Sequence, residues 1–158
     1  MYKRQVQVPE GPVLDGVLDD AVWDSGALID NFVQQEPDEG APTSEHTEVR
    51  VLYDSETLYL GLRATDSAPM GVTATEMRRD SERILDEDNF QIILDTFMDS
   101  RSAYMFVTNP LGAQLDQQIA NEGEGNRRNR QSGFGTSNIN KDWDGVWHVA
   151  ASQDANGW

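Results

Sequence analysis

The sequence predicts an all-β protein, an antiparallel, jelly-roll-like β-sandwich with one short helix near its N-terminus. Apolar and polar residues alternate with a period of two through most of the chain, which is typical of strands that bury one face. Short polar turns separate these runs, so consecutive strands are expected to pair as antiparallel neighbours. The 158 residues are enough for one domain with its own hydrophobic core, and we expect a single domain over residues 1–158.

Asp15-Gly16 is predicted to form a turn, because glycine adopts a positive φ without steric cost. The predicted helix follows this turn. Asp19 or Asp20 is expected to cap the helix. The apolar face of the helix is formed by Leu18, Ala21, Val22 and Trp23. We expect the indole of Trp23, the largest side chain on that face, to lie in the core.

A β-hairpin is predicted over residues 47–65. Two alternating runs, residues 47–54 and 58–65, are separated by the polar turn Asp54-Ser55-Glu56. One face of each run carries apolar or small side chains, namely Val49, Val51 and Tyr53 in the first and Leu58, Leu60, Leu62 and Ala64 in the second.

Four further strands are expected in the second half of the chain, over residues 89–97, 103–108, 113–119 and 145–152. The first three are joined by the turns Met98-Asp99-Ser100-Arg101 and Asn109-Pro110-Leu111-Gly112.

Two segments interrupt the alternating pattern. Residues 36–45 are rich in Pro, Gly, Asp and Thr and are expected to form a surface loop. Residues 121–141 form a longer loop, which we expect to be disordered or to become ordered on ligand binding, because long irregular loops are uncommon in compact domains.

Charge and composition exclude several classes of partner. The chain has 28 acidic and 12 basic residues and a formal net charge of −16, which disfavours nucleic acids and anionic membrane surfaces. It has no cysteine, which excludes disulfides and thiolate metal sites. No apolar run approaches the ~18 residues of a membrane-spanning helix, and the first five residues lack the apolar segment of a secretion signal.

The opening turn, cap and tryptophan of residues 14–23 resemble the start of family 9 carbohydrate-binding modules, and residues 88–95 resemble the central strand of that family. The resemblance extends from about Pro12 to Trp158, and within the family it is greatest to the module at the amino end of bacterial outer-membrane barrel proteins. Further segments in matching order are residues 48–66, Arg78-Arg79-Asp80, residues 88–112 and residues 142–147. The resemblance implies non-catalytic binding of an oligo- or polysaccharide and a periplasmic or extracellular location.

The resemblance also bears on the end of the chain. In such modules, a segment like residues 154–158 leads into a closing strand, whereas this chain stops at Trp158. We therefore expect a domain truncated at its C-terminal strand. An unpaired sheet edge would follow, and it would favour a homodimer, because such an edge can pair with another chain.

Trp143 is the principal candidate for stacking on a sugar ring. A flat indole covers the C–H face of a pyranose, and the polar neighbours of Trp143 place it in a turn. The structural alternative is a loop tryptophan that closes one end of the sandwich. Trp147, on an alternating run, is assigned to the core.

Hydrogen bonds to sugar hydroxyls are expected from Arg78, Arg79 and Asp80, because the guanidinium group is a fixed fork of donors and the carboxylate supplies acceptors. A surface ion pair is the structural alternative. Asn109 and Gln117 are further candidates for hydrogen bonds to sugar, although Asn109 also suits a purely structural role in its turn.

Calcium is the metal that the acidic residues suit best. Asp86 and Asp88 lie in an oxygen-rich run before a strand, and Asp66 ends an earlier strand. The resemblance implies that calcium would be structural. A solvated acidic turn is the alternative interpretation of the same residues.

Other classes of function have less support. Acidic pairs that could cleave glycosides are expected by chance among so many carboxylates, and the two histidines, His46 and His148, are too few for a zinc site or a nucleophile triad. We therefore predict that the protein is not an enzyme. Haem ligation by His148 with a methionine (Met70, Met77 or Met105) is a third class. The main alternative is an accessory interaction domain of an outer-membrane barrel protein that has no sugar affinity.

Overall fold

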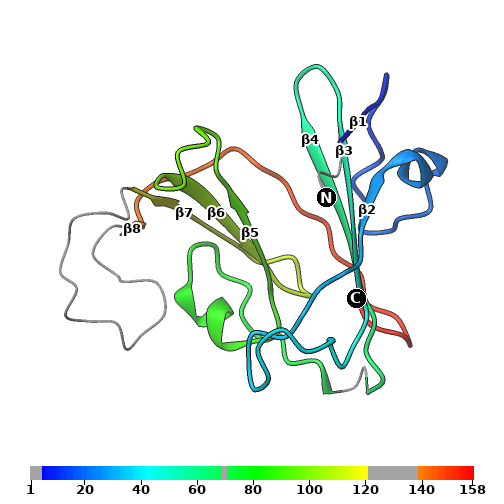
Figure 1. Ribbon diagram of the computed structural model, residues 1–158, viewed down its shortest axis with the longest axis vertical. Helices are drawn as coiled ribbons and strands as arrows, with labels where there is room; N and C mark the ends of the chain where they lie inside the picture. The colour runs from blue at the N-terminus through cyan, green and yellow to red at the C-terminus, as the bar shows by residue number, and fades with distance from the viewer. Residues whose placement is uncertain (1–4, 69–70, 121–138) are drawn as a thin grey trace. The chain divides into compact units, whose positions relative to one another are not determined.

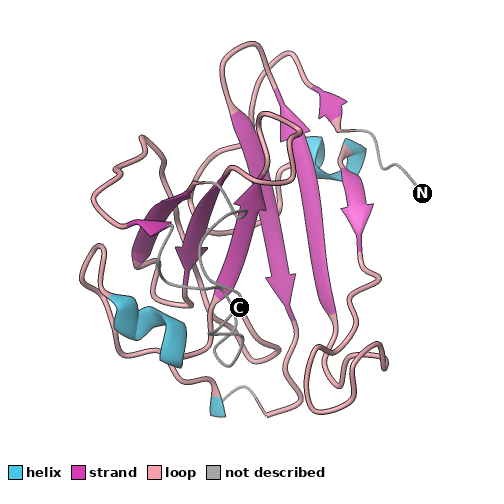
Figure 2. Cartoon of the chain, turned by 60° about the vertical axis from the view of Figure 1, so that its left-hand side comes forward, coloured by secondary structure: helices cyan, strands magenta, loops and turns pink. Residues whose placement is uncertain are grey.

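The protein is all-β, as the sequence predicts. The computed structural model describes residues 5–68, 71–120 and 139–158, in which two four-stranded, mainly antiparallel sheets form and the helical turns are 3-10 helices (Figures 1 and 2). The loop expected over residues 121–141 falls mostly outside these described residues. The chain divides into two compact units, Met1–Val72 with Ala150–Trp158, and Thr73–Val149. No helix in the described ranges has the length and apolar character to cross a membrane.

Strand β3 (Thr47–Tyr53) is the centre of the first sheet (Figure 1). It pairs over its whole length with antiparallel β4 (Leu58–Ala64), which confirms the predicted hairpin. Its other edge pairs with antiparallel β2 (Ala27–Ile29) and with parallel β1 (Val6–Gln7). Asp54 holds the hairpin turn, because its carboxylate accepts hydrogen bonds from the amides of Glu56 and Thr57 at 2.8 Å and from the Tyr59 hydroxyl at 2.7 Å.

The predicted N-terminal helix is a five-residue 3-10 helix, η1 (Ala21–Ser25), and Trp23 is buried in the core as expected. Trp23 packs in a cluster with Val8 and Leu52. Asp20 occupies the N-cap position, as one of the two predicted candidates, but the expected capping hydrogen bond does not form. Its side chain makes no cap and instead accepts a hydrogen bond from the backbone amide of Val13 at 2.9 Å.

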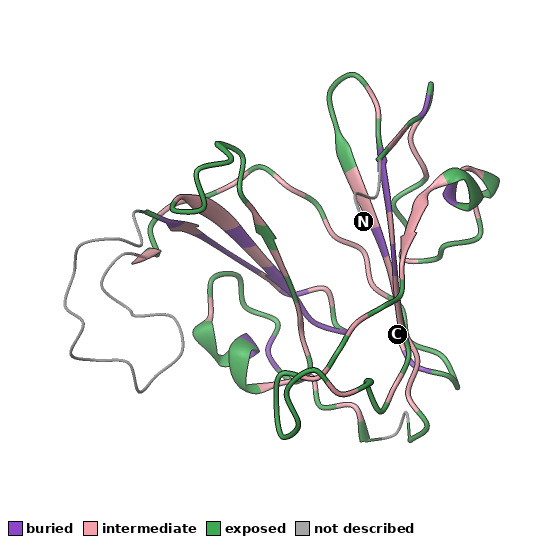
Figure 3. Cartoon of the chain, in the orientation of Figure 1, coloured by how far each residue is buried: buried purple, intermediate pink, exposed green. Residues whose placement is uncertain are grey.

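The second sheet has the order β5-β6-β7-β8 and is antiparallel throughout. Its strands are β5 (Phe90–Leu94), β6 (Ala103–Thr108), β7 (Gln114–Ile119) and β8 (Ile139–Asn140). The 3-10 helix η3 (Glu82–Asp86) places Ile84 in the core of this unit. The other buried members of that core are Met105, Val107, Ala113, Leu115 and Ile119, and Figure 3 shows the burial along β6 and β7.

Strand β5 is shorter than the predicted run of residues 89–97. The Asp95 carboxylate accepts hydrogen bonds from the amides of Asp99 and Ser100 at 3.3 and 2.8 Å, so the turn begins directly after Leu94. Met98 and Ser100 adopt positive φ angles of 52° and 54° in this turn.

The strand predicted over residues 145–152 does not form. Some backbone groups of this segment bond to side chains: the Gly145 amide donates to Asp116, and the Trp147 carbonyl accepts from Gln114. Further along, Trp158 exchanges two backbone hydrogen bonds with Ala64, at 2.8 and 3.0 Å.

Trp23→Ala should lower the free energy of unfolding by about 3–5 kcal/mol, because it empties the core of the first unit. Trp23→Phe should cost less than half as much, since the ring is kept and the buried indole nitrogen, which has no hydrogen-bond partner among the described residues, is removed. Urea unfolding followed by circular dichroism measures both. Val33→Ala, at a side chain 61% exposed, is the control and should change stability by less than about 0.5 kcal/mol. Equal losses in all three variants would contradict this assignment of the core.

Candidate functional site

Four aromatic side chains meet at one face of the second sheet. Tyr104 and Phe106 occupy alternate positions of β6, and the segment after β8 brings Trp143 and Trp147 against them. Trp143 packs on Tyr104 with ring centroids 4.6 Å apart and planes tilted by 34°, and it meets Phe106 edge-on at 5.8 Å. Trp147 meets Phe106 edge-on at 5.3 Å. All four rings are half-buried, so each keeps some surface exposed.

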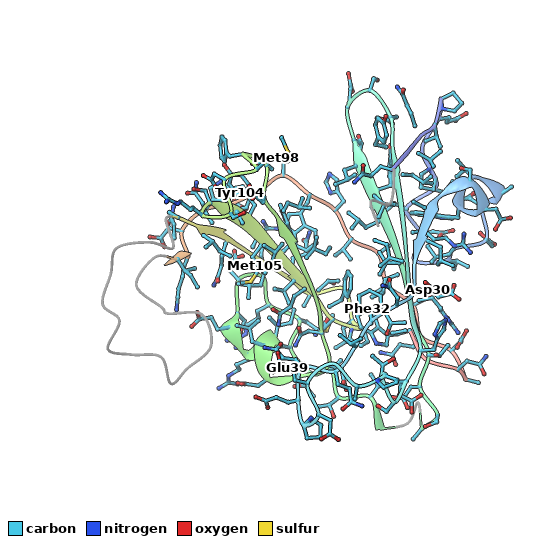
Figure 4. All side chains as sticks on the ribbon, in the orientation of Figure 1. Asp30, Phe32, Glu39, Met98, Tyr104 and Met105 are labelled. Carbon is cyan, nitrogen blue, oxygen red and sulfur yellow. The ribbon has the colours of Figure 1, made fainter. Side chains whose placement is uncertain are left out.

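The alternation of β6 separates this aromatic face from the core of the unit. Tyr104 and Met105 are adjacent on the strand and are labelled in Figure 4. Successive side chains of a strand leave opposite faces, so Met105 joins the buried core while Tyr104 joins the aromatic cluster.

Asp116 lies beside the aromatic cluster and is completely buried. It is paired directly with Phe106 across β6 and β7, which places both side chains on the same face. Its carboxylate accepts hydrogen bonds from the Arg79 Nη2 at 2.9 Å, the Gly145 amide at 2.5 Å and the Trp147 Nε1 at 3.1 Å.

Arg79 connects this buried carboxylate to the surface. Its Nη2 also bonds to the Asp144 carboxylate and to the Gly145 carbonyl, the latter at 3.3 Å. Its Nη1 donates to Gln114 Oε1 at 3.2 Å, and its Nε lies 3.5 Å from Asp80. Burial lowers the pKa of Arg79, but the bond to Asp144 and the surrounding carboxylate charges raise it above its ordinary value. The guanidinium group is therefore committed to the protein's own acceptors.

Arg78 belongs to a different network, although it precedes Arg79 in the chain. Its Nε and Nη2 bond to the two carboxylate oxygens of Glu76 at 3.0 and 2.9 Å, and Ser81 donates to the same carboxylate at 2.6 Å. Glu76 is only 7% exposed, whereas the Arg78 side chain is 69% exposed. The hydrogen bonds from Arg78 and Ser81 hold the pKa of Glu76 far below its usual range.

The structure thus brings Arg79 and Asp80 to the segment that carries Trp143, and it gives Arg78 a separate partner. Two further predicted residues are closed off from solvent. Asn109 is fully buried, donates to the Glu76 carbonyl at 2.8 Å and accepts from the amides of its own turn. Gln117 is 3% exposed and lies on the face of β7 opposite to Asp116. Neither side chain is placed to touch a ligand.

The three aspartates nominated for calcium serve the backbone or face solvent. Asp88 accepts from the Thr73 amide and Asp66 from the Ala68 amide, each at 2.6 Å, and Asp86 is exposed at the end of η3. In the described part of the chain no three His, Cys, Asp or Glu side chains are grouped so that they could hold a metal ion.

The described residues nominated for haem differ in burial. Met105 is a core residue, Met77 is 70% exposed and His148 is exposed, while Met70 lies outside the described residues.

Sequence reasoning missed Asp116, Asp144 and Tyr104. An acidic residue in the middle of an alternating strand is a visible signal for Asp116, because a strand position of that kind is either solvated or paired with a cation. Its partner could not be found from the sequence, since the register of β6 and β7 and the position of Arg79 come only from the fold.

The fold is therefore all-β, with half-buried aromatic rings beside fixed polar groups on one sheet face. The family described as carbohydrate family 9 binding domain-like matches residues 14–152, and the chain belongs to this family. Searches of curated proteins and of solved structures found no match. Membership supports carbohydrate binding in general. Domains of this kind are usually non-catalytic and typically extracellular or periplasmic.

Acidification should destabilise the protein through Glu76. Its pKa is lower in the folded protein than the usual 4.5, so the stability it contributes is complete above about pH 4.5 and is lost as the pH falls toward the folded pKa. Arg78→Gln should raise the pKa of Glu76 toward its ordinary value, which an NMR titration of the carboxyl carbon measures. Arg83→Gln, at an exposed arginine of η3, is the control and should leave this pKa unchanged. A pKa of Glu76 that stays equally low without the Arg78 guanidinium would contradict the assignment.

Proposed function

We propose that the protein is a non-catalytic carbohydrate-binding module that holds an oligo- or polysaccharide against Trp143. One observation carries the proposal: the indole of Trp143 is fixed against Tyr104 with centroids 4.6 Å apart, and part of its surface remains exposed. A flat apolar surface of this kind suits the C–H face of a pyranose ring. Stacking between rings contributes about 1 kcal/mol beyond the burial of area, so we expect modest affinity.

Carboxylates on both sides of Trp143 would bind the sugar hydroxyls. Asp142 and Asp144 flank it in the sequence, and the Asp144 side chain is 76% exposed and held by Arg79. A carboxylate accepts hydrogen bonds and a hydroxyl donates them, so Asp144 is oriented to act as an acceptor for the saccharide. Arg79 and Asp80 complete the border of the site in this proposal.

Arg78 has a smaller part in the proposal than the sequence suggests. Two of its side-chain nitrogen atoms are bonded to Glu76, and no described contact links it to the Trp143 segment. Asn109 and Gln117 are excluded from the proposed contact surface because both are buried.

Trp143→Ala should weaken saccharide binding by about tenfold or more, because it removes the stacking surface. A glycan array identifies the ligand, and calorimetric titration then measures the dissociation constant of each variant. Trp143→Phe should retain part of the affinity, since a smaller ring is kept. Phe97→Ala, at an aromatic side chain 65% exposed in the turn after β5, is the matched control and should bind as the wild type does. Wild-type affinity in Trp143→Ala would overturn the proposal, as would a wild-type protein that binds no glycan.

Charge around the site should select against acidic saccharides. Asp80, Asp116 and Asp144 surround the single guanidinium group of Arg79, and the whole chain carries a formal net charge of −16. The same glycan oxidised to carboxylates at C6 should bind about fivefold more weakly at low ionic strength, and the difference should shrink as salt is added. Asp144→Asn should reduce the discrimination. Equal affinity for the neutral and oxidised forms at low salt would contradict this prediction.

A further inference from the structure

The carboxylate of Asp116 holds the segment that carries Trp143, residues 143–147, through hydrogen bonds. Gly145 and Trp147 stand two and four residues after Trp143, and both donate hydrogen bonds to Asp116, at 2.5 and 3.1 Å. The two bonds join a backbone amide and an indole of the segment to the middle of β7. Asp116 is completely buried, so it has no surface to offer a ligand.

The third donor to Asp116 supplies the compensating charge. An ionised carboxylate in a buried position is costly unless it is paired and hydrogen-bonded. The Arg79 Nη2 lies 2.9 Å from Asp116 and also bonds to Asp144, which follows Trp143 directly. Arg79 therefore links the exposed Asp144 side chain to Asp116, the same carboxylate that bonds to the Gly145 amide.

Close packing adds a second constraint at Gly145. A Cβ atom at this position would lie 2.8 Å from the Trp143 ring and 3.3 Å from the Phe106 ring. The absence of a side chain lets the backbone approach Asp116 while the Trp143 indole lies over it. Gln114 adds a further tie, because its Nε2 donates to the Trp147 carbonyl at 3.1 Å.

We propose that Asp116 is a positioning residue for saccharide binding, which acts through Arg79, Gly145 and Trp147 to hold Trp143 in its stacking position. This inference rests on the proposed function, in which Trp143 makes the contact with the sugar. Fixing an aromatic ring before the ligand arrives reduces the conformational entropy that binding must overcome, so the carboxylate raises affinity without touching the saccharide.

The test is Asp116→Asn, which keeps the shape of the side chain and removes its charge. An amide has one acceptor oxygen and presents its NH₂ group to at least one of the three donors, so the anchor is broken in part. We expect the dissociation constant for the glycan chosen by the array to rise about tenfold. Gly145→Ala should weaken binding by a similar factor through an independent route, because its Cβ displaces the Trp143 ring.

A control matched for stability separates positioning from general loss of structure. Leu115→Ala, one position before Asp116 on β7, leaves a cavity in the core on the opposite face of the sheet. It should lower the melting temperature at least as much as Asp116→Asn does, yet keep the wild-type dissociation constant at a temperature where both proteins are folded. Equal losses of affinity in the two variants would overturn the proposal, as would unchanged affinity in Asp116→Asn.

A spectroscopic measurement without sugar distinguishes failure of this inference from failure of the proposed function. Arg79 and Trp147 both bond to Oδ1 of Asp116, whereas the Gly145 amide bonds to Oδ2, so the amide group of Asn faces Gly145 when its oxygen keeps the other two donors. Hydrogen exchange of the Gly145 amide, followed by NMR, should therefore be about tenfold faster in Asp116→Asn than in the wild type and unchanged in Leu115→Ala. If Trp143→Ala binds sugar as the wild type does, the proposed function fails while faster exchange of the Gly145 amide still supports the anchor. Unchanged exchange of this amide in Asp116→Asn overturns the anchor, whatever the glycan results are.

Discussion

The candidate site depends on one constraint, the burial of a charged carboxylate in the middle of a strand. A buried carboxylate needs hydrogen-bond donors, and Asp116 accepts from a guanidinium group, a backbone amide and an indole N–H. These three donors come from two segments, residue 79 and residues 145–147, that lie far apart in the sequence. The carboxylate therefore joins both segments to strand β7.

Strand positions were predictable from the sequence because they follow from a local period of two. Strand β6 agrees with its predicted bounds, whereas β3 and β4 each end one residue before the end of the predicted run, at Tyr53 and Ala64. The predicted strand bounds were wrong where a side chain, and not a neighbouring strand, bonds to the backbone. Asp95 ends β5 early, and in the run predicted over residues 145–152 the Gly145 amide and the Trp147 carbonyl bond to the side chains of Asp116 and Gln114. Hydrogen bonds from side chains to the backbone do not change the alternation of apolar residues, so the sequence pattern does not reveal them.

The candidate site was predictable in its parts but not in its connections. Trp143, Arg79 and Asp80 were nominated from residue type and resemblance, and the structure pairs Arg79 with Asp80 and with Asp144, the residue after Trp143. The adjacent Arg78 was nominated on the same grounds, yet its side chain bonds to Glu76. Which of two neighbouring arginines reaches the site is decided by backbone direction and by long-range register, neither of which a single sequence reveals.

Val146 lies between Gly145 and Trp147, the two residues anchored to Asp116, and its side chain is 98% exposed. The hydrogen bonds that hold Gly145 and Trp147 do not involve Val146, so its side chain can be replaced while these two residues stay in place. Sequence drift there would alter what the surface recognises at little cost to folding. Position 146 is consequently a natural starting point for a library that seeks new ligand specificities on this scaffold.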